Sequence, residues 1–80
     1  MNQAFDEAFG RRIRTLWEQK GLTQEALAAR MQVLGCDVTR GALAKIETAL
    51  RHVYPDEIAA LAAALGVSPN ELFRIDCNSK

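Results

Sequence analysis

The chain has 80 residues, enough for one small domain with a single core. Apolar residues make up 49% and charged residues 25%, which is typical of a globular protein and excludes a disordered one. The 10 basic residues balance the 10 acidic ones, and no uncharged stretch is long enough to span a membrane. Because the first residues lack a basic segment followed by an apolar one, we expect no signal peptide and a cytosolic protein, in which Cys36 and Cys77 are free thiols.

The zero net charge hides an uneven distribution along the chain. Residues 11–51 hold eight of the ten basic residues and four of the ten acidic ones, and the segments on either side are acidic. A polyanion could therefore bind one face of the folded chain without the whole protein being basic. A chance imbalance among solvated helices explains the same pattern equally well.

Apolar residues recur at intervals of three and four along the whole chain, so the sequence predicts an all-α fold. The predicted helices, in chain order, are one at 4–20 that ends at Gly21, one from Thr23 to Gly35, one that begins at Thr39, one that begins at Pro55 and stops before Gly66, and a short one after Ser68. We expect a single compact domain of five helices over residues 1–80, with its core in about 4–75.

Three of the predicted helix starts share one local pattern. A hydroxyl residue caps the helix, and the apolar residue before it can pack against a leucine one turn inside; the sets are Leu22-Thr23 with Leu27, Val38-Thr39 with Leu43, and Val67-Ser68 with Leu72. Each cap is worth on the order of 1 kcal/mol. The caps therefore fix where the short helices begin.

The third predicted helix has a bare side. On a helical wheel the side that points to the core is formed by Leu43, Ile46 and Leu50. The opposite side is formed by Gly41, Ala44, Lys45 and Thr48. Of the two flanks between these sides, one holds Arg40 and Arg51 and the other holds Ala42. The major groove of DNA, about 12 Å wide, accepts a helix, and small side chains let the backbone lie deeper. Arg40 could then bind guanine, Lys45 a base edge or phosphate, and the methyl group of Ala42 or Ala44 could touch thymine. Alternatively, the glycine and alanines mark a close contact between helices of one chain or of two copies.

Three segments, G-L-T-Q-E-A-L-A at 21–28, V-T-R-G-A-L-A-K-I-E at 38–47 and L-G-V-S-P-N-E-L-F at 65–73, carry a family resemblance. They are similar to the Cro and phage-repressor type of helix-turn-helix domain, also known as the lambda-repressor-like or xenobiotic-response-element family. The resemblance covers about residues 9–73. It implies five helices, of which the second and third form the motif and the third enters the major groove.

The resemblance also implies DNA contacts at particular positions. Gln24 matches a glutamine that contacts DNA in the family, although it is also an ordinary polar residue for a first helical turn. Thr39 matches the cap of the recognition helix. Arg40, Gly41 and Lys45 fall on positions that contact bases in the family, although Gly41 has no side chain that could make such a contact. Arg51 and His52 fall in a loop that contacts phosphate in relatives. With the bare side of the third helix, the predicted DNA-binding residues are Gln24, Thr39, Arg40, Gly41, Ala44, Lys45, Thr48, Arg51 and His52; Arg14 and Arg30 are expected on solvated faces.

The sequence departs from the family pattern between the second and third helices and at one buried ion pair. Thr23 and Thr39 are sixteen positions apart, about five more than is usual, which predicts a longer second helix and a looser, extended turn. Trp17 stands where the family often has an arginine that pairs with the glutamate matching Glu47. We therefore expect Trp17 in the core and Glu47 bonded to Arg51.

A further departure concerns the end of the third helix. Ala49 stands where relatives often have a glycine. Either the helix continues toward Leu50 and Arg51, or Ala49 carries strain of about 1 kcal/mol.

The sequence offers little chemistry for catalysis or metal binding. Its one histidine, His52, has no second base or carboxylate at a recognisable spacing, and no glycine-rich phosphate loop occurs. The spacings of Cys36, His52 and Cys77 match no metal-ligand pattern. We expect no enzyme, no cofactor and no metal. Cys36 falls in the inserted turn, where exposure would make it sensitive to oxidation.

These features predict a transcriptional regulator, a repressor by type, that binds double-stranded DNA. We expect a homodimer, because one recognition helix contacts too few base pairs for useful specificity. Leu72, Phe73 and Ile75 are the predicted dimer surface, unless they close the base of the monomer core. The alternative function is a protein-interaction module or an antitoxin-like partner of another protein, which the zero net charge and Gly41 also fit.

Overall fold

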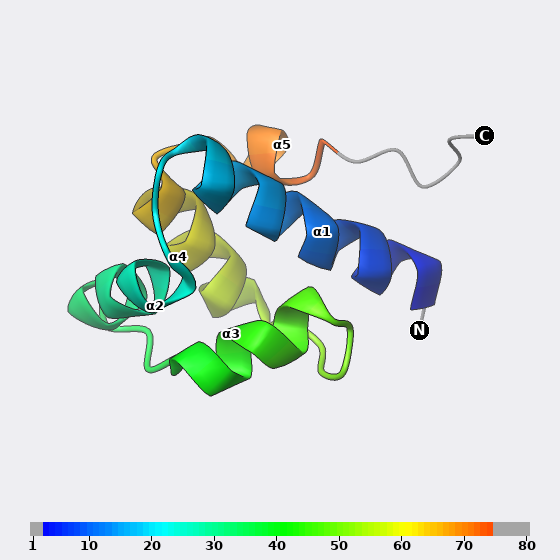
Figure 1. Cartoon of the computed structure of the whole chain (residues 1–80), viewed down its shortest axis with the longest axis horizontal. Helices are drawn as coiled ribbons and strands as arrows, with labels where there is room; N and C mark the ends of the chain where they lie inside the picture. The colour runs from blue at the N-terminus through cyan, green and yellow to red at the C-terminus, as the bar shows by residue number, and fades with distance from the viewer. Residues whose placement is uncertain (1–2, 75–80) are drawn as a thin grey trace.

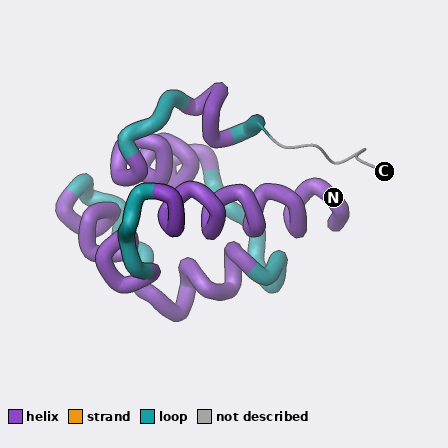
Figure 2. The backbone as a smooth tube through the Cα atoms, turned by 45° about the horizontal axis from the view of Figure 1, so that its top comes forward, coloured by secondary structure: helices purple, strands orange, loops and turns teal. Residues whose placement is uncertain are grey.

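A computed structural model describes residues 3–74 of the chain. Within that range the chain forms five α-helices and no strand: α1 (Gln3–Gln19), α2 (Gln24–Val33), α3 (Arg40–Glu47), α4 (Pro55–Leu65) and α5 (Pro69–Leu72). The predicted five-helix, all-α fold with an extended turn between the second and third helices is therefore confirmed. α3 lies along one edge of the molecule and α5 along the opposite edge (Figure 1), with α1 running between them (Figure 2).

The predicted hydroxyl caps are present at all three helix starts. The side chains of Thr23, Thr39 and Ser68 accept hydrogen bonds from the backbone N–H of Ala26, Ala42 and Glu71 at 3.0, 3.1 and 3.1 Å. α4 lacks a hydroxyl cap and instead uses a carboxylate: Tyr54 N–H donates to Glu57 at 3.0 Å. These bonds satisfy donors that a helix start leaves without a partner, so the helix starts follow from local sequence.

The turn from α2 to α3 is extended but well anchored. Cys36 N–H donates to the Met31 carbonyl at 2.9 Å, and the Gln32 side chain donates to the Val38 carbonyl at 3.1 Å. Gly35, at φ 90°, reverses the chain between these bonds, so α2 ends at Val33 and not at the glycine. The expected looseness of the turn and the exposure of Cys36 are both wrong, because Cys36 and Val38 are buried in the core.

α1 lies close against the end of α3 at Gly10. A Cβ atom at this position would lie 2.3 Å from the Glu47 carbonyl oxygen and 2.7 Å from its carbon. Gly10 is buried, so its hydrogen-only side chain is what lets the two helices cross at this distance. The sequence suggested Gly41 of the third helix as a candidate for a close contact between helices. In the structure Gly10 of the first helix makes such a contact instead.

α3 ends at Glu47, earlier than the apolar pattern predicted. Ala49 adopts φ 62°, so of the two alternatives for this residue the strained one is correct. This left-handed residue turns the chain away from the helix axis, and Leu50 is 75% exposed. The prediction that Leu50 belongs to the core is therefore wrong, and Val53 packs against the core instead.

The end of the described chain closes the core. Leu72 is fully buried, so its assignment to a dimer surface is wrong and the alternative, closure of the monomer core, is correct for this residue. Phe73 stacks on Phe9 and Phe5, with ring centroids 5.3 and 6.3 Å apart, and remains 39% exposed. Ile75, the third residue of that surface, lies outside the described residues, as does Cys77.

Candidate nucleic-acid interface

The outer side of α3 faces solvent. Leu43 and Ile46 are buried on its inner side, whereas Gly41, Lys45 and Thr48 are exposed and Ala44 is half-buried. A Cβ atom added to Gly41 would meet a single nearby atom, the Thr39 hydroxyl oxygen at 3.8 Å. Within residues 3–74, therefore, Gly41 does not mark a contact between helices, and the centre of the outer side is open.

Two cations flank this open centre. Arg40 and Lys45 are both exposed, and the side chain of neither forms a hydrogen bond or ion pair with another residue in 3–74. They lie about 7.5 Å apart along the helix axis, at a rise of about 1.5 Å per residue. Both charges are thus free to meet an anion or a base edge alongside α3.

Glu47 at the end of α3 links three helices. Its carboxylate accepts a hydrogen bond from the indole N–H of Trp17 on α1 at 2.7 Å and one from the amide of Gln24 on α2 at 3.1 Å. The predicted bond from Glu47 to Arg51 is wrong, because α3 ends before Arg51 and the two residues are not on neighbouring turns. Trp17 is half-buried beside the core, and its indole N–H supplies the donor that the family's arginine would provide.

Arg51 and His52 bond to carboxylates of their own chain. The two terminal nitrogens of Arg51 meet the Glu57 carboxylate at 3.0 and 2.7 Å, and its guanidinium lies 5.8 Å from the centre of the Tyr54 ring. The hydrogen bonds from Arg51, and secondarily that from Tyr54 N–H, hold the pKa of the buried Glu57 carboxyl below its ordinary value. His52 is exposed, with Nδ1 3.2 Å from the Asp6 carboxylate. Both residues therefore tie the loop between α3 and α4 to the rest of the chain.

The predicted site residues thus fall into two groups. Thr39, Arg40, Gly41, Ala44, Lys45 and Thr48 share α3 and its cap, and Gln24 is joined to them through Glu47. Arg51 and His52 stand apart, in the loop that follows. The sequence did not predict that Gly10 sets the distance between α1 and α3. It also did not predict the hydrogen bond that Trp17 donates, although the presence of tryptophan at the family's arginine position was a signal that could have indicated it.

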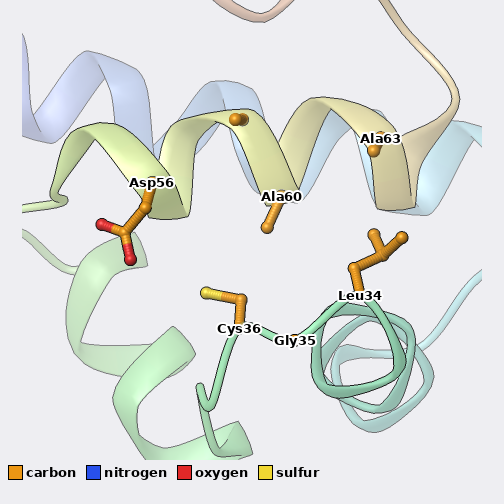
Figure 3. A pocket seen from close by; sticks show the side chains of 7 residues that line it. Leu34, Gly35, Cys36, Asp56, Ala60 and Ala63 are labelled. Atoms are coloured by element: carbon orange, nitrogen blue, oxygen red, sulfur yellow. The ribbon is translucent and has the colours of Figure 1, made fainter.

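One hollow of the surface is lined by no residue of α3. A hollow of about 300 Å³ separates the end of α2 from α4 (Figure 3), lined by Leu34, Gly35, Cys36, Asp56, Ala59, Ala60 and Ala63. Burial first, and then the carboxylates of Glu57 and Asp56, raise the pKa of the Cys36 thiol, so this cysteine is a poor nucleophile near neutral pH. Among residues 3–74, no three histidine, cysteine or acidic side chains are grouped as metal ligands.

In the part of the chain that the structure describes, no helix combines the length and apolarity needed to cross a bilayer.

Comparison with known proteins agrees with the geometry of α2 and α3. The family model "Helix-turn-helix domain" matches residues 8–74. The chain is also similar to the crystal structure of the restriction-modification controller protein C.AhdI from Aeromonas hydrophila, with a TM-score of 0.72 and 39% sequence identity over 82% of this chain and 92% of that one. Comparison with curated proteins gave no match.

Proposed function

Because the chain belongs to the helix-turn-helix domain family, of the Cro and phage-repressor type, whose members are DNA-binding regulators, we propose that it binds double-stranded DNA sequence-specifically and represses transcription. α3 enters the major groove in this proposal. The observation that carries it is the outer side of α3, which is exposed, small at Gly41, and flanked by Arg40 and Lys45 without partners among residues 3–74. The similarity to a controller protein supports a regulatory role.

Each residue of the interface has a distinct task in this proposal. Arg40 donates two hydrogen bonds to guanine, and Lys45 reaches a base edge or a phosphate. Gly41 lets the helix backbone approach the groove floor, and the Ala44 methyl group meets a thymine methyl. Thr48 has its hydroxyl hydrogen turned to the Ala44 carbonyl at 3.0 Å, so it contributes as an acceptor.

The residues at the ends of α3 contact or support the phosphate backbone. Thr39 caps α3 as an acceptor, and its own O–H remains a donor for phosphate. Gln24 gives one amide N–H to Glu47 and keeps the second. In this proposal His52, which is exposed, meets phosphate through the ring nitrogen that does not face Asp6, whereas Arg51 acts indirectly by bonding the loop to Glu57.

We also infer that the chain acts as a homodimer. One recognition helix covers few base pairs, and two copies related by a twofold axis read half-sites about 34 Å apart, one turn of DNA. Such a regulator acts in the compartment that holds the DNA, which fits the expected cytosolic location.

Substitution of Arg40 by alanine tests the proposal at the residue assigned to base reading. Selection of bound sequences from random duplex DNA should give a preferred site for the parent, and Arg40→Ala should lose the preference at one base position and bind about 1–3 kcal/mol more weakly. The matched control is Arg74→Ala, which removes the same charge from a residue that pairs with Glu71 of α5; α5 lies on the edge opposite α3 (Figure 1). Equal affinity and equal preference of Arg40→Ala and the parent at constant salt would refute the assigned role.

A further inference from the structure

Trp17 on α1 is fixed by contacts on two sides of its ring. Its indole N–H donates to the Glu47 carboxylate at 2.7 Å. The Arg14 guanidinium lies over the ring, 5.7 Å from its centre, and is itself bonded to the Glu18 carboxylate at 3.0 Å. The ring is also half-buried against the core. Together these contacts hold the indole N–H in one place at the end of α3.

Glu47 is fixed by α1 at both its backbone and its side chain. Gly10 lies against its backbone, where an added Cβ atom would come within 2.3 Å of the Glu47 carbonyl oxygen. Gly10 and Trp17 are seven positions apart, about two turns, so both face α3 from the same side of α1. Glu47 forms no ion pair with another residue in 3–74, and its carboxylate is bonded to the neutral donors of Trp17 and Gln24. A hydrogen bond to an ionised acceptor is roughly twice as strong as one between neutral groups, so both bonds restrain their donors firmly.

The chemistry of these groups decides the orientation of the Gln24 amide. An ionised carboxylate accepts hydrogen bonds and cannot donate them, so the nitrogen of the Gln24 amide faces Glu47, at 3.1 Å, and the oxygen does not. The indole N–H is a donor only, and it meets Oε2 of the carboxylate, whereas the amide meets Oε1. Trp17 therefore holds the carboxylate without competing for Gln24. The carbonyl oxygen and the second N–H of the amide stay available for another partner.

We propose that Trp17 is a positioning residue for DNA recognition, which acts through Glu47 to hold the Gln24 amide in the orientation that meets the duplex. The inference rests on the proposed function, in which the second N–H of Gln24 donates to a phosphate. Because Gln24 is already held in its binding orientation, DNA binding does not have to immobilise it. Holding one such side chain in advance is worth about threefold to tenfold in affinity.

A double-mutant cycle tests the proposal, with affinity measured for the selected duplex at constant salt. Gln24→Ala should weaken binding by the parent about fivefold. Trp17→Phe, which keeps an aromatic ring and removes the N–H, should weaken binding by a similar factor. Adding Gln24→Ala to Trp17→Phe should then change affinity by less than about twofold, because the two side chains act as one unit. Losses that multiply in the double variant would overturn the proposal, and so would a folded Trp17→Phe variant that binds as the parent does.

Further variants separate positioning from stability. Trp17→Arg supplies Glu47 with a donor again, so Gln24→Ala should again weaken binding about fivefold in this background. Glu47→Ala removes the link but keeps the indole, so Gln24→Ala should have little effect there, and this variant carries the test if Trp17→Phe does not fold. The opposite result in either background would contradict the positioning role. Tyr54→Phe, which removes a donor from an exposed aromatic side chain outside the network, is the matched control and should keep the full effect of Gln24→Ala.

A measurement without DNA tests the link itself. The chain has one tryptophan, so its indole N–H gives one signal in an NMR spectrum. The indole hydrogen should exchange with solvent more slowly in the parent than in Glu47→Ala, and equal exchange would overturn the inference. Multiplying losses in the cycle, with a base preference that still depends on Arg40, would overturn this inference and leave the proposed function standing. A parent that binds no duplex would overturn the proposed function, and the positioning role with it.

Discussion

Replacing Gly10 by alanine should destabilise the protein by about 3 kcal/mol, although alanine is the better helix former by about 1 kcal/mol. The added methyl group would lie 2.3 Å from the Glu47 carbonyl oxygen and 2.8 Å from its Cα, and both are backbone atoms that no side-chain rotation can move. α1 and α3 would have to separate, which would also stretch the hydrogen bond from Trp17 to Glu47. Urea denaturation of the two proteins measures the difference.

Gly41→Ala is the matched control for this substitution. It makes the same change inside α3, where the new methyl group would meet open space apart from the Thr39 oxygen at 3.8 Å. Its stability should rise by up to about 1 kcal/mol. If Gly10→Ala proved as stable as the parent, the close crossing of α1 and α3 would be wrong.

The second large effect is expected at Glu57, through its dependence on pH. The Arg51 hydrogen bonds lower the pKa of Glu57 in the folded protein from its ordinary value of 4.5, while the unfolded chain keeps that value. The ionised, paired carboxylate therefore stabilises the fold fully above about pH 4.5. This stabilisation is lost as the pH falls below that value and through the lowered pKa of the folded state.

Glu57→Gln should remove this part of the acid sensitivity and cost about 2 kcal/mol at neutral pH, because Arg51 keeps a weaker acceptor in a buried position. Chemical denaturation of both proteins from pH 7 down to pH 3 should show a smaller loss of stability for the variant. Glu25→Gln, at an exposed carboxylate, provides the control and should change stability by less than about 1 kcal/mol. Parallel pH profiles for Glu57→Gln and the parent would contradict the role given to the pair.

The parts of the fold that sequence reasoning predicted correctly are those set by neighbouring residues. Thr23, Thr39 and Ser68 cap their helices through bonds that span three positions, and the pattern of leucines around them defines the inner faces. The same local information placed Arg40 and Lys45 on the outer side of α3. Such features depend on spacing along one helix, so a single sequence is enough to derive them.

The errors arose where a distant or unusual backbone contact decides the outcome. Periodicity extended α3 to Leu50, but it contains no information on the left-handed Ala49 that ends the helix. Glu47 was paired with a residue nearby in sequence, whereas its donors come from Trp17 and Gln24 on two other helices. Gly10 gave no signal because its contact is a carbonyl group thirty-seven positions away, and composition alone treats a helical glycine as a weak point.

The proposed function depends on Arg40 and Lys45, whose side chains have no partner among residues 3–74, to bring α3 into the groove of a specific duplex. Equilibrium binding to a duplex selected from random sequences, and to a scrambled duplex, over a series of salt concentrations tests this dependence. Affinity for the selected duplex should exceed that for the scrambled one at every salt concentration and fall steeply as salt rises, and Lys45→Ala should reduce the logarithmic slope by about 1. No binding to any duplex at the lowest salt, with a protein partner recovered in its place, would contradict the account.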